Sequence, residues 1–417
     1  MNLFIKQARI VDPGGPHHLK TVDLAIADGS IQKIGAKLRN TGDYREIKLK
    51  NLHVSPGWFD SSVAFGEPGY EERETLENGL KVAAASGFTD IALQPATNPV
   101  GDNQAQIRFV KSKASGATSL HPIGALTRGS AGKDMAELYD MHQSGAVAFG
   151  DYSQYIGNAN LMKIALQYVQ DFNGLVIGYS MDQTLAANGM AHEGVAAIRL
   201  GLKGIPALAE ELAVARNLYL LEYTGGRLHI PTVSTAKALQ LIREAKNKGL
   251  NVTCSVSVHH LLLTDESLEG FDTRYKVMPP LRDEATRKAL VKGVKDGIID
   301  CITSDHFPMD IEHKKMEFDL AATGTIGLES AFGALGTLFP TDMIVARLTA
   351  ARKVFNLPVV SVAQGETACL TLFDPDADWT FTEDAILSAS KNSAFLGRKM
   401  KGAVYGIVNN NQLNLNL

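Results

Sequence analysis

Residues 53–69 read HVSPGWFDSSVAFGEPG, a run of β-prone and apolar side chains that ends in a turn rich in glycine and proline. Residues 74–87, ETLENGLKVAAASG, follow with apolar side chains at helical spacing, and Gly87 is a candidate C-cap. A strand, a loop and a helix in this order make one βα unit. The fold then depends on how often the chain repeats that unit.

The unit recurs along most of the chain. Seven further β-rich runs follow, at residues 88–94, 120–126, 146–150, 175–180, 227–234, 250–257 and 298–305. Helical patterns separate them, most clearly at residues 205–223, 234–249 and 283–297. Eight strands, each followed by a helical crossover connection, are typical of a (β/α)₈ barrel. We therefore predict an α/β fold with a TIM-like barrel over residues 53–365.

Both ends of the chain have a different pattern. Residues 3–15, 22–36 and 45–54 alternate apolar and polar side chains between glycine-containing turns, and residues 366–382 and 402–417 do the same. Neither end is expected to form a stable sheet alone. We predict that residues 1–52 and residues 366–417 pair as one small β-sandwich beside the barrel.

The composition is that of a soluble globular protein. The chain has 417 residues, of which 45% are hydrophobic and 21% charged, and its net charge is −4. No basic stripe indicates a nucleic-acid partner, and no apolar run is long enough to suggest a membrane span. The start of the chain lacks a signal-peptide pattern, so we expect a cytoplasmic location. Cys254, Cys301 and Cys369 lie far apart in apolar stretches, which predicts buried thiols in a reducing compartment.

Reactive groups in such a barrel lie at the carboxyl ends of the strands. These ends carry few groups capable of chemistry: two carboxylates and a few histidines. In chain order the candidates are Ser62, Ala64 and Gly66; Gln94 and Ala96; Asp151; Tyr179; Thr232; His259 and His260; Asp305 and His306.

Several motifs carry a resemblance to a known family. They are SPGWFDSSVAFGEPG, QPATNPVGDN, GAVAFGD, RLHIPTVST, VTCSVSVHHLLLT, MPPLRDE, DGIIDCITSDHFP and GTIGLESA. At this spacing the chain resembles the dihydroorotases of the amidohydrolase superfamily from end to end. The resemblance implies a barrel with a split β-sandwich, and zinc-dependent hydrolysis of a cyclic amide in pyrimidine biosynthesis.

The metal-binding positions of that family have changed. Its first motif, Asp-x-His-x-His-x-Arg, has Ser62 and Ala64 in place of both histidines. The ligand histidine of strand five matches Tyr179, and that of strand six matches Thr232. Of the ligands implied by the resemblance, the sequence keeps the bridging acid, Asp151, and the metal-binding aspartate and general base, Asp305.

The substrate-binding positions have changed as well. Gly66 stands where the family has the motif arginine, Ala96 where it has the first Asn of PNTNP, and Met278 where it has the Asn of NPPLR. The final histidine of the family's TDHAPH motif is Met309. We therefore predict no substrate-binding residue of the family type.

Zinc needs three or four N, S or O ligands at about 2.0–2.3 Å. Two carboxylates do not meet that need, so we predict no metal ligands and no cofactor, with Asp305 as a vestigial catalytic residue. Without a cation, two acids in one pocket would repel, and one would take up a proton. His259 and His260 match positions that do not bind the metal in the family, and we expect structural roles for them.

Three functions stay open. The first is a non-catalytic dihydroorotase homologue that serves as a structural or regulatory subunit; the resemblance extends to ligand-less chains that assemble with aspartate transcarbamoylases. The second is an active dihydroorotase or related cyclic amidohydrolase, with zinc in a site rebuilt from His259, His306, Asp151 and Asp305. The third is a small-molecule sensor. We expect a homo-oligomer or a transcarbamoylase complex, and neither nucleic acid nor membrane as a partner.

The helical stretch at residues 205–223 carries an apolar stripe that includes Leu208, Leu212 and Ala215. We predict that this stripe packs against the barrel, because apolar residues at helical spacing usually mark the face that a helix buries.

Overall fold

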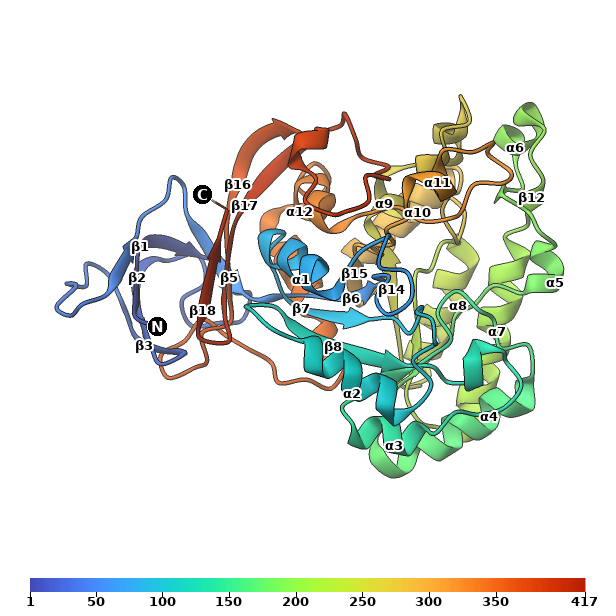
Figure 1. Cartoon of the computed structure of the whole chain (residues 1–417), viewed down its shortest axis with the longest axis horizontal. Helices are drawn as coiled ribbons and strands as arrows, with labels where there is room; N and C mark the ends of the chain where they lie inside the picture. Colours follow the sequence, from blue (N-terminus) through green and yellow to red (C-terminus); the bar gives the residue numbers. More distant parts are fainter. Residues whose placement is uncertain (417) are drawn as a thin grey trace.

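A computed structural model describes residues 1–416 of the chain. Its centre is a closed barrel of eight parallel strands, in which neighbours in the chain are neighbours in the barrel (Figure 1). The ring closes where Val63 bridges His306, and the Ala64 N–H donates to the His306 carbonyl at 2.8 Å. The strands are β6 (Trp58–Val63), β7 (Phe88–Leu93), β8 (Ser119–Gly124), β9 (Ala148–Phe149), β10 (Val176–Ile177), β13 (Leu228–Ile230), β14 (Val252–Ser257) and β15 (Cys301–Thr303). The predicted barrel and all eight of its strands are confirmed.

Helices surround the barrel, and side-chain caps fix where several of them begin. The Thr75 hydroxyl accepts from the Asn78 N–H, and the Thr235 hydroxyl from the Ala238 N–H. The helices are α1 (Leu76–Ala85), α2 (Gln104–Lys113), α3 (Leu138–Gln143), α4 (Ala159–Tyr168), α5 (Gln183–Ala186), α6 (Val195–Leu200), α7 (Leu208–Thr224), α8 (Ala236–Asn247), α9 (Val258–Leu262), α10 (Glu284–Lys295), α11 (Ile311–Lys314), α12 (Leu328–Gly336), α13 (Thr341–Thr349) and α14 (Ala351–Val354). A short pair, β11 (Ala191–His192) and β12 (Gly204–Ile205), flanks α6. Between residues 1 and 416 no helix is both long and apolar enough to cross a membrane.

The two chain ends share one sheet beside the barrel, as predicted (Figure 1). Its strands are β1 (Leu3–Ile10), β2 (Thr21–Ala27), β3 (Ser30–Gly35), β4 (Arg45–Ile47), β5 (His53–Pro56), β16 (Leu370–Thr380), β17 (Lys399–Asn409) and β18 (Gln412–Leu415). The register joins the ends directly, because Ser55 of β5 pairs antiparallel with Thr371 of β16. Residues 53–56 therefore belong to this sheet, and the first barrel strand begins only at Trp58.

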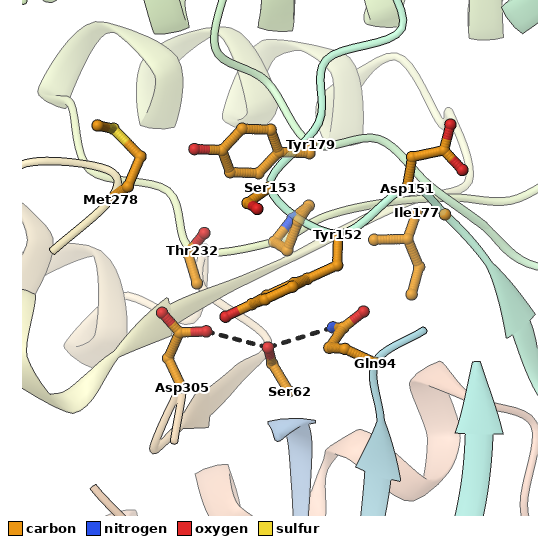
Figure 2. A pocket seen from close by; sticks show the side chains of 12 residues that line it. Ser62, Gln94, Asp151, Tyr152, Ser153, Ile177, Tyr179, Thr232, Met278 and Asp305 are labelled. Carbon is orange, nitrogen blue, oxygen red and sulfur yellow. Dashed lines mark hydrogen bonds between the residues drawn. The ribbon is translucent and has the colours of Figure 1, made fainter. Parts of the chain in front are cut away.

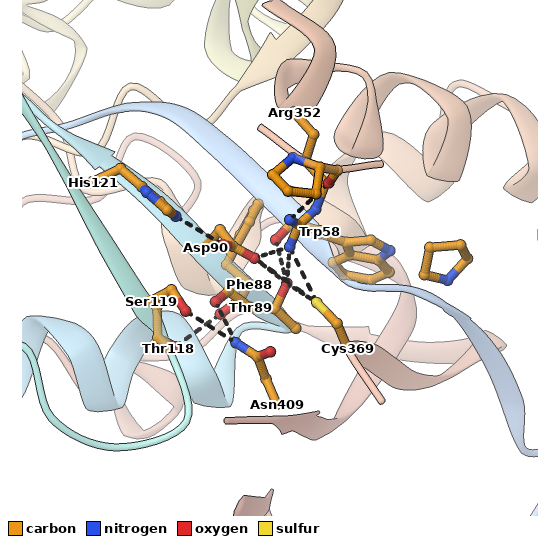
Figure 3. A network of polar contacts seen from close by, with 12 residues as sticks. Trp58, Phe88, Thr89, Asp90, Thr118, Ser119, His121, Arg352, Cys369 and Asn409 are labelled. Carbon is orange, nitrogen blue, oxygen red and sulfur yellow. Dashed lines mark hydrogen bonds and ion pairs between the residues drawn. The ribbon is translucent and has the colours of Figure 1, made fainter. Parts of the chain in front are cut away.

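A buried polar network links the barrel to the C-terminal part of the chain (Figure 3). Asp90 of β7 accepts hydrogen bonds from Arg352 of α14 and from the Thr89 hydroxyl, and it lies 2.8 Å from Nε2 of His121. The Asn409 amide of β17 donates to the carbonyls of Thr89, at 3.0 Å, and Ala117, at 2.9 Å. The side chains of Asp90 and Arg352 are only 5% and 8% exposed. The two parts of the fold are thus joined by specific polar contacts as well as by apolar packing.

The sequence predicted that Leu208, Leu212 and Ala215 of α7, here called the α7 stripe, pack against the barrel, and this prediction is wrong. Leu208 and Leu212 are 53% and 51% exposed, and Ala215 is partly exposed. The face turned to the barrel carries a different apolar set: Ala209, Ala213, Val214, Leu218 and Leu221. Because α7 is apolar on both faces, its periodicity could not show which face lies inside.

Candidate functional site

The carboxyl ends of the barrel strands surround a small pocket (Figure 2). Six of the predicted candidates line it together, so strand-end reasoning located the site: Ser62, Gln94, Asp151, Tyr179, Thr232 and Asp305. Met278, at the position of the family's asparagine, also lines the pocket. The other candidates, Ala64, Gly66, Ala96, His259, His260 and His306, are not part of its lining.

The carboxyl group of Asp305 accepts a hydrogen bond from a serine. The Ser62 hydroxyl donates to Oδ1 of Asp305 at 3.0 Å, and the Gln94 amide donates to the Ser62 hydroxyl at 3.2 Å (Figure 2). Burial raises the pKa of the Asp305 carboxyl to about 7, although hydrogen bonds from Ser62 and Tyr152 oppose the shift. A neutral acid fits this place, because nothing beside it supplies a positive charge.

Asp151 turns away from the pocket centre. Its carboxylate accepts hydrogen bonds from the Thr127 hydroxyl and from the Thr127 N–H at 2.9 Å. Figure 2 shows it pointing to the side opposite Asp305. Burial raises the pKa of this carboxyl too. The two surviving acids of the family's metal site therefore do not converge on one point.

Aromatic side chains fill the space between them. The ring of Tyr152 crosses the pocket with its hydroxyl directed toward Asp305, and Tyr179 lies above it in Figure 2. The Tyr179 hydroxyl is buried without a hydrogen-bond partner, and burial raises its pKa. Sequence reasoning missed Tyr152; the one signal available was that it directly follows Asp151 at a strand end.

The pocket is too small for a cyclic amide. The space left for the centre of a water-sized sphere is about 20 Å³, which is room for roughly one water molecule. Sites for small organic ligands usually enclose about 300–1,000 Å³. The rings of Tyr152 and Tyr179 thus fill most of the space at the strand ends.

Gly66 occupies a turn that has no room for a side chain. Its N–H donates to the Glu74 carbonyl at 2.9 Å, and its carbonyl accepts from the Tyr70 N–H at 3.0 Å. A Cβ atom at this position would lie 1.7 Å from the Tyr70 carbonyl oxygen. The family's arginine could return here only if the backbone of the turn moved.

The histidines near the mouth are neutral, and two of them have structural partners. His260 pairs its Nδ1 with the Ser257 hydroxyl at 2.6 Å, and burial lowers its pKa to about 4. His306 accepts the Gly327 N–H at Nδ1 (3.3 Å), and burial lowers its pKa to about 3. Within residues 1–416 neither ring nitrogen of His259 has a hydrogen-bond partner, and burial lowers its pKa also.

The residues do not fit a zinc ion. Over residues 1–416, no three His, Cys, Asp or Glu side chains lie close enough together to hold a metal. This includes the rebuilt set of His259, His306, Asp151 and Asp305, which the fold does not bring together. Ser62, Ala64, Tyr179 and Thr232 offer zinc no imidazole at the family's ligand positions.

Comparison with known proteins places the chain in a family. A dihydroorotase of Pelotomaculum thermopropionicum is 42% identical over 416 residues, which cover 98% of this chain and 97% of that protein. The chain belongs to the dihydroorotase family. The family model described as dihydro-orotase-like matches residues 52–238, and a dihydroorotase of Geotalea daltonii is 38% identical over 98% of each chain. The predicted resemblance to this family is confirmed.

Solved structures support the same fold. The L-hydantoinase (dihydropyrimidinase) of Arthrobacter aurescens superposes with a TM-score of 0.87 over 99% of this dihydroorotase homologue and 95% of that chain. Sequence identity between the two is 22%, so this likeness concerns the fold alone.

The Asp305→Asn variant tests the protonation of the site. Unfolded aspartate ionises near 3.8, whereas Asp305 in the folded chain keeps its proton to about pH 7. Unfolding therefore releases a proton between these values, and the stability of the unmodified protein falls as pH rises through that window. Asparagine does not titrate. We compare the free energies of unfolding of the two proteins in urea. Between pH 4.5 and pH 8 that of the variant should rise by on the order of 3 kcal/mol relative to that of the unmodified protein. No change in relative stability over the same range would contradict the raised pKa and would indicate a cation that keeps Asp305 ionised.

Proposed function

We propose that this dihydroorotase homologue is non-catalytic and serves as a structural or regulatory subunit in pyrimidine biosynthesis. One observation carries the proposal: at the strand ends the Ser62 hydroxyl binds Asp305, and the rings of Tyr152 and Tyr179 leave room for about one water. Catalysis by this family depends on a metal-activated water, and the chain supplies neither the ligands nor the space for it.

The proposed partner is aspartate transcarbamoylase, and the proposed location is the cytoplasm. Support for the partner comes from the resemblance to dihydroorotase-like chains that lack the metal histidines and assemble with that enzyme. The test is to mix the purified chain with the transcarbamoylase of the same organism and to separate the mixture by size-exclusion chromatography. A joint peak and a raised melting temperature of the transcarbamoylase are expected; two separate peaks would contradict the partnership.

A working amidohydrolase is the second candidate. The observation that favours it is backbone strain at the strand ends, because Thr232 and Asp305 have φ angles of 45° and 49°. Such left-handed residues are frequent at active sites. An active enzyme would need to open the pocket around Tyr152 and recruit zinc. Dihydroorotate turnover by the purified chain, assayed with added zinc, separates this candidate from the first.

The zinc content of the purified protein is the most direct test of whether the chain binds a metal. We expect the recombinant protein, purified without chelator, to contain well under one zinc per chain by elemental analysis. A complete structural zinc site is worth about 10–16 kcal/mol, and two diverging carboxylates supply only a small part of it.

The melting temperature provides the control for that measurement. Adding EDTA should leave it unchanged within error, because no metal contributes to the stability of the fold. One zinc per chain, or a drop of several degrees with EDTA, would contradict the expected result.

A further inference from the structure

A groove with a volume of about 580 Å³ lies between three segments that are distant in the chain. They are residues 309–315, which follow the last barrel strand and include α11, residues 272–274, and residues 389–392 in the connection from β16 to β17. Figure 1 shows this connection extending from the end sheet toward α11. Sites for small organic ligands usually enclose about 300–1,000 Å³, so the groove has the size of such a site. It shares no lining residue with the pocket at the strand ends.

Hydrogen bonds join the walls of the groove to one another. The Thr273 hydroxyl donates to the Lys314 carbonyl at 2.7 Å, and the Met309 N–H donates to the side-chain oxygen of Asn392 at 3.2 Å. Met309, which is buried, and Ile311, which is 71% exposed, add apolar surface to the lining. The groove is therefore formed in the folded chain itself, as binding sites for small molecules usually are.

Lys314 is a buried lysine in the lining of the groove. The residue is 5% exposed, and its Nζ donates to the carbonyls of Ala322 and Gly324, both at 2.9 Å. A lysine ammonium group has three N–H donors, so one donor remains without an acceptor among residues 1–416. Burial and the charge of Lys276 lower the pKa of Lys314 to about 7, against the opposite effect of Asp272. An anion in the groove would favour the charged form of this lysine.

The groove as a whole has an excess of positive charge. Lys315 and Lys391 are exposed and line it together with Lys314, and in the part of the chain that the structure describes none of these three lysines forms an ion pair. The acids of the lining, in contrast, are each paired with a basic side chain. The pairs are Asp272 with Arg274 (2.9 Å), Glu72 with Arg73 (3.9 Å) and Asp310 with His313 (2.7 Å). The unpaired charges of the groove are therefore positive.

We propose that this groove binds an organic phosphate, whose phosphate group is bound by Lys314, Lys315 and Lys391 and whose organic part contacts Met309 and Ile311. A phosphate group carries about −1.5 to −2 charges at pH 7, so it can balance more than one lysine, whereas a carboxylate balances one. Lysine binds phosphate through its compact positive charge. The groove is separate from the pocket at the strand ends, so the proposal stands whether or not the chain is catalytic.

Calorimetric titration of the full chain tests the chemistry of the ligand with four probes: phenyl phosphate, benzoate, inorganic phosphate and phenol. Phenyl phosphate should bind once per chain with a Kd of about 1 mM or below. The other three should bind at least about tenfold more weakly, because benzoate carries a single charge, inorganic phosphate lacks the organic part, and phenol lacks the charge. No binding of phenyl phosphate, or equally tight binding of any other probe, would overturn the proposal.

The double variant Lys315→Gln, Lys391→Gln tests the position of the site. Both lysines are exposed, so the variant should keep the melting temperature of the unmodified protein, and it should bind phenyl phosphate at least about tenfold more weakly. The matched control is Lys33→Gln, Lys353→Gln, which removes two exposed charges outside the groove and should keep its affinity. Unchanged affinity in the first variant, or an equal loss in both, would overturn the proposal.

Acetylation of lysines in the unmodified protein locates the site without any substitution. The protein is treated with N-succinimidyl acetate, and the modified lysines are identified by mass spectrometry. Saturating phenyl phosphate should slow the acetylation of Lys315 and Lys391 severalfold and leave the rates at Lys33 and Lys353 unchanged. Equal rates at Lys315 and Lys391 with and without phenyl phosphate would overturn the assignment of the groove.

Discussion

Restoring the four metal histidines is expected to leave dihydroorotate hydrolysis at least about a thousandfold below that of a family member with a complete site. The variant carries Ser62→His, Ala64→His, Tyr179→His and Thr232→His. Removing Tyr179 opens part of the pocket, and the new imidazoles lie at strand ends where metal could return. Substrate contacts do not return with them. A polar or charged contact to bound substrate contributes about 1.5–3 kcal/mol. Three such contacts are missing, because Gly66, Ala96 and Met278 stand where the family has an arginine and two asparagines. Their combined loss exceeds a thousandfold in kcat/KM.

Adding those contacts back is not expected to complete the repair. A septuple variant would include Ala96→Asn, Met278→Asn and Gly66→Arg. The last change places a Cβ atom 1.7 Å from the Tyr70 carbonyl oxygen, and the backbone of the turn must move to admit it. We expect the septuple variant to be inactive and less stable than the quadruple variant.

The measurement is the rate of dihydroorotate hydrolysis at saturating zinc, with the metal content of each variant determined in parallel. Metal content separates a failure to bind zinc from a failure to bind substrate. Robust turnover by the quadruple variant would show that the pocket still holds substrate and would contradict this prediction; turnover by the unmodified protein would overturn the non-catalytic proposal. The unmodified protein is therefore assayed beside both variants under the same conditions.

The sequence was sufficient for the barrel and for the location of the site. Strand patterns in a βα repeat determine the closed sheet, and the geometry of the barrel brings every strand end to one face. For that reason the strand order alone was enough to place Ser62, Asp151, Tyr179 and Asp305 around one pocket. The pairing of the two chain ends followed from the same logic, since each end has strands but too few to form a stable sheet.

Side-chain direction could not be predicted in this way. Asp151 lies at the predicted strand end, but its carboxylate is bound by Thr127, which is remote in sequence. Tyr152 crosses the pocket toward Asp305, which lies far from it in the sequence. The α7 stripe was assigned to the wrong face, because periodicity identifies an apolar face only when the opposite face is polar. In each case the deciding contact is between residues distant in the chain.

Breaking the buried ion pair of Asp90 and Arg352 is expected to lower the free energy of unfolding by a large amount. In Arg352→Met the methionine fills most of the arginine's space, but the Asp90 carboxylate stays buried without its cation (Figure 3). Removing one member of a buried ion pair costs about 3–5 kcal/mol, because the remaining charge is uncompensated. Urea unfolding should show a loss of this size for Arg352→Met. The double variant Arg352→Met, Asp90→Asn should lose clearly less, because a neutral amide replaces the stranded charge and can still contact Thr89 and His121.

The exposed ion pair of Lys81 and Glu77 is the matched control for this prediction. Their side chains are 67% and 75% exposed, and the two charges lie 2.7 Å apart. Water and salt screen such a pair, so Lys81→Met should leave the free energy of unfolding nearly unchanged. The contrast rests on burial, since both changes remove one cation from one carboxylate. If Arg352→Met cost no more than Lys81→Met, the expected effect of burial on the ion pair would be contradicted. Arg352 would then stabilise the junction between barrel and end sheet through packing alone.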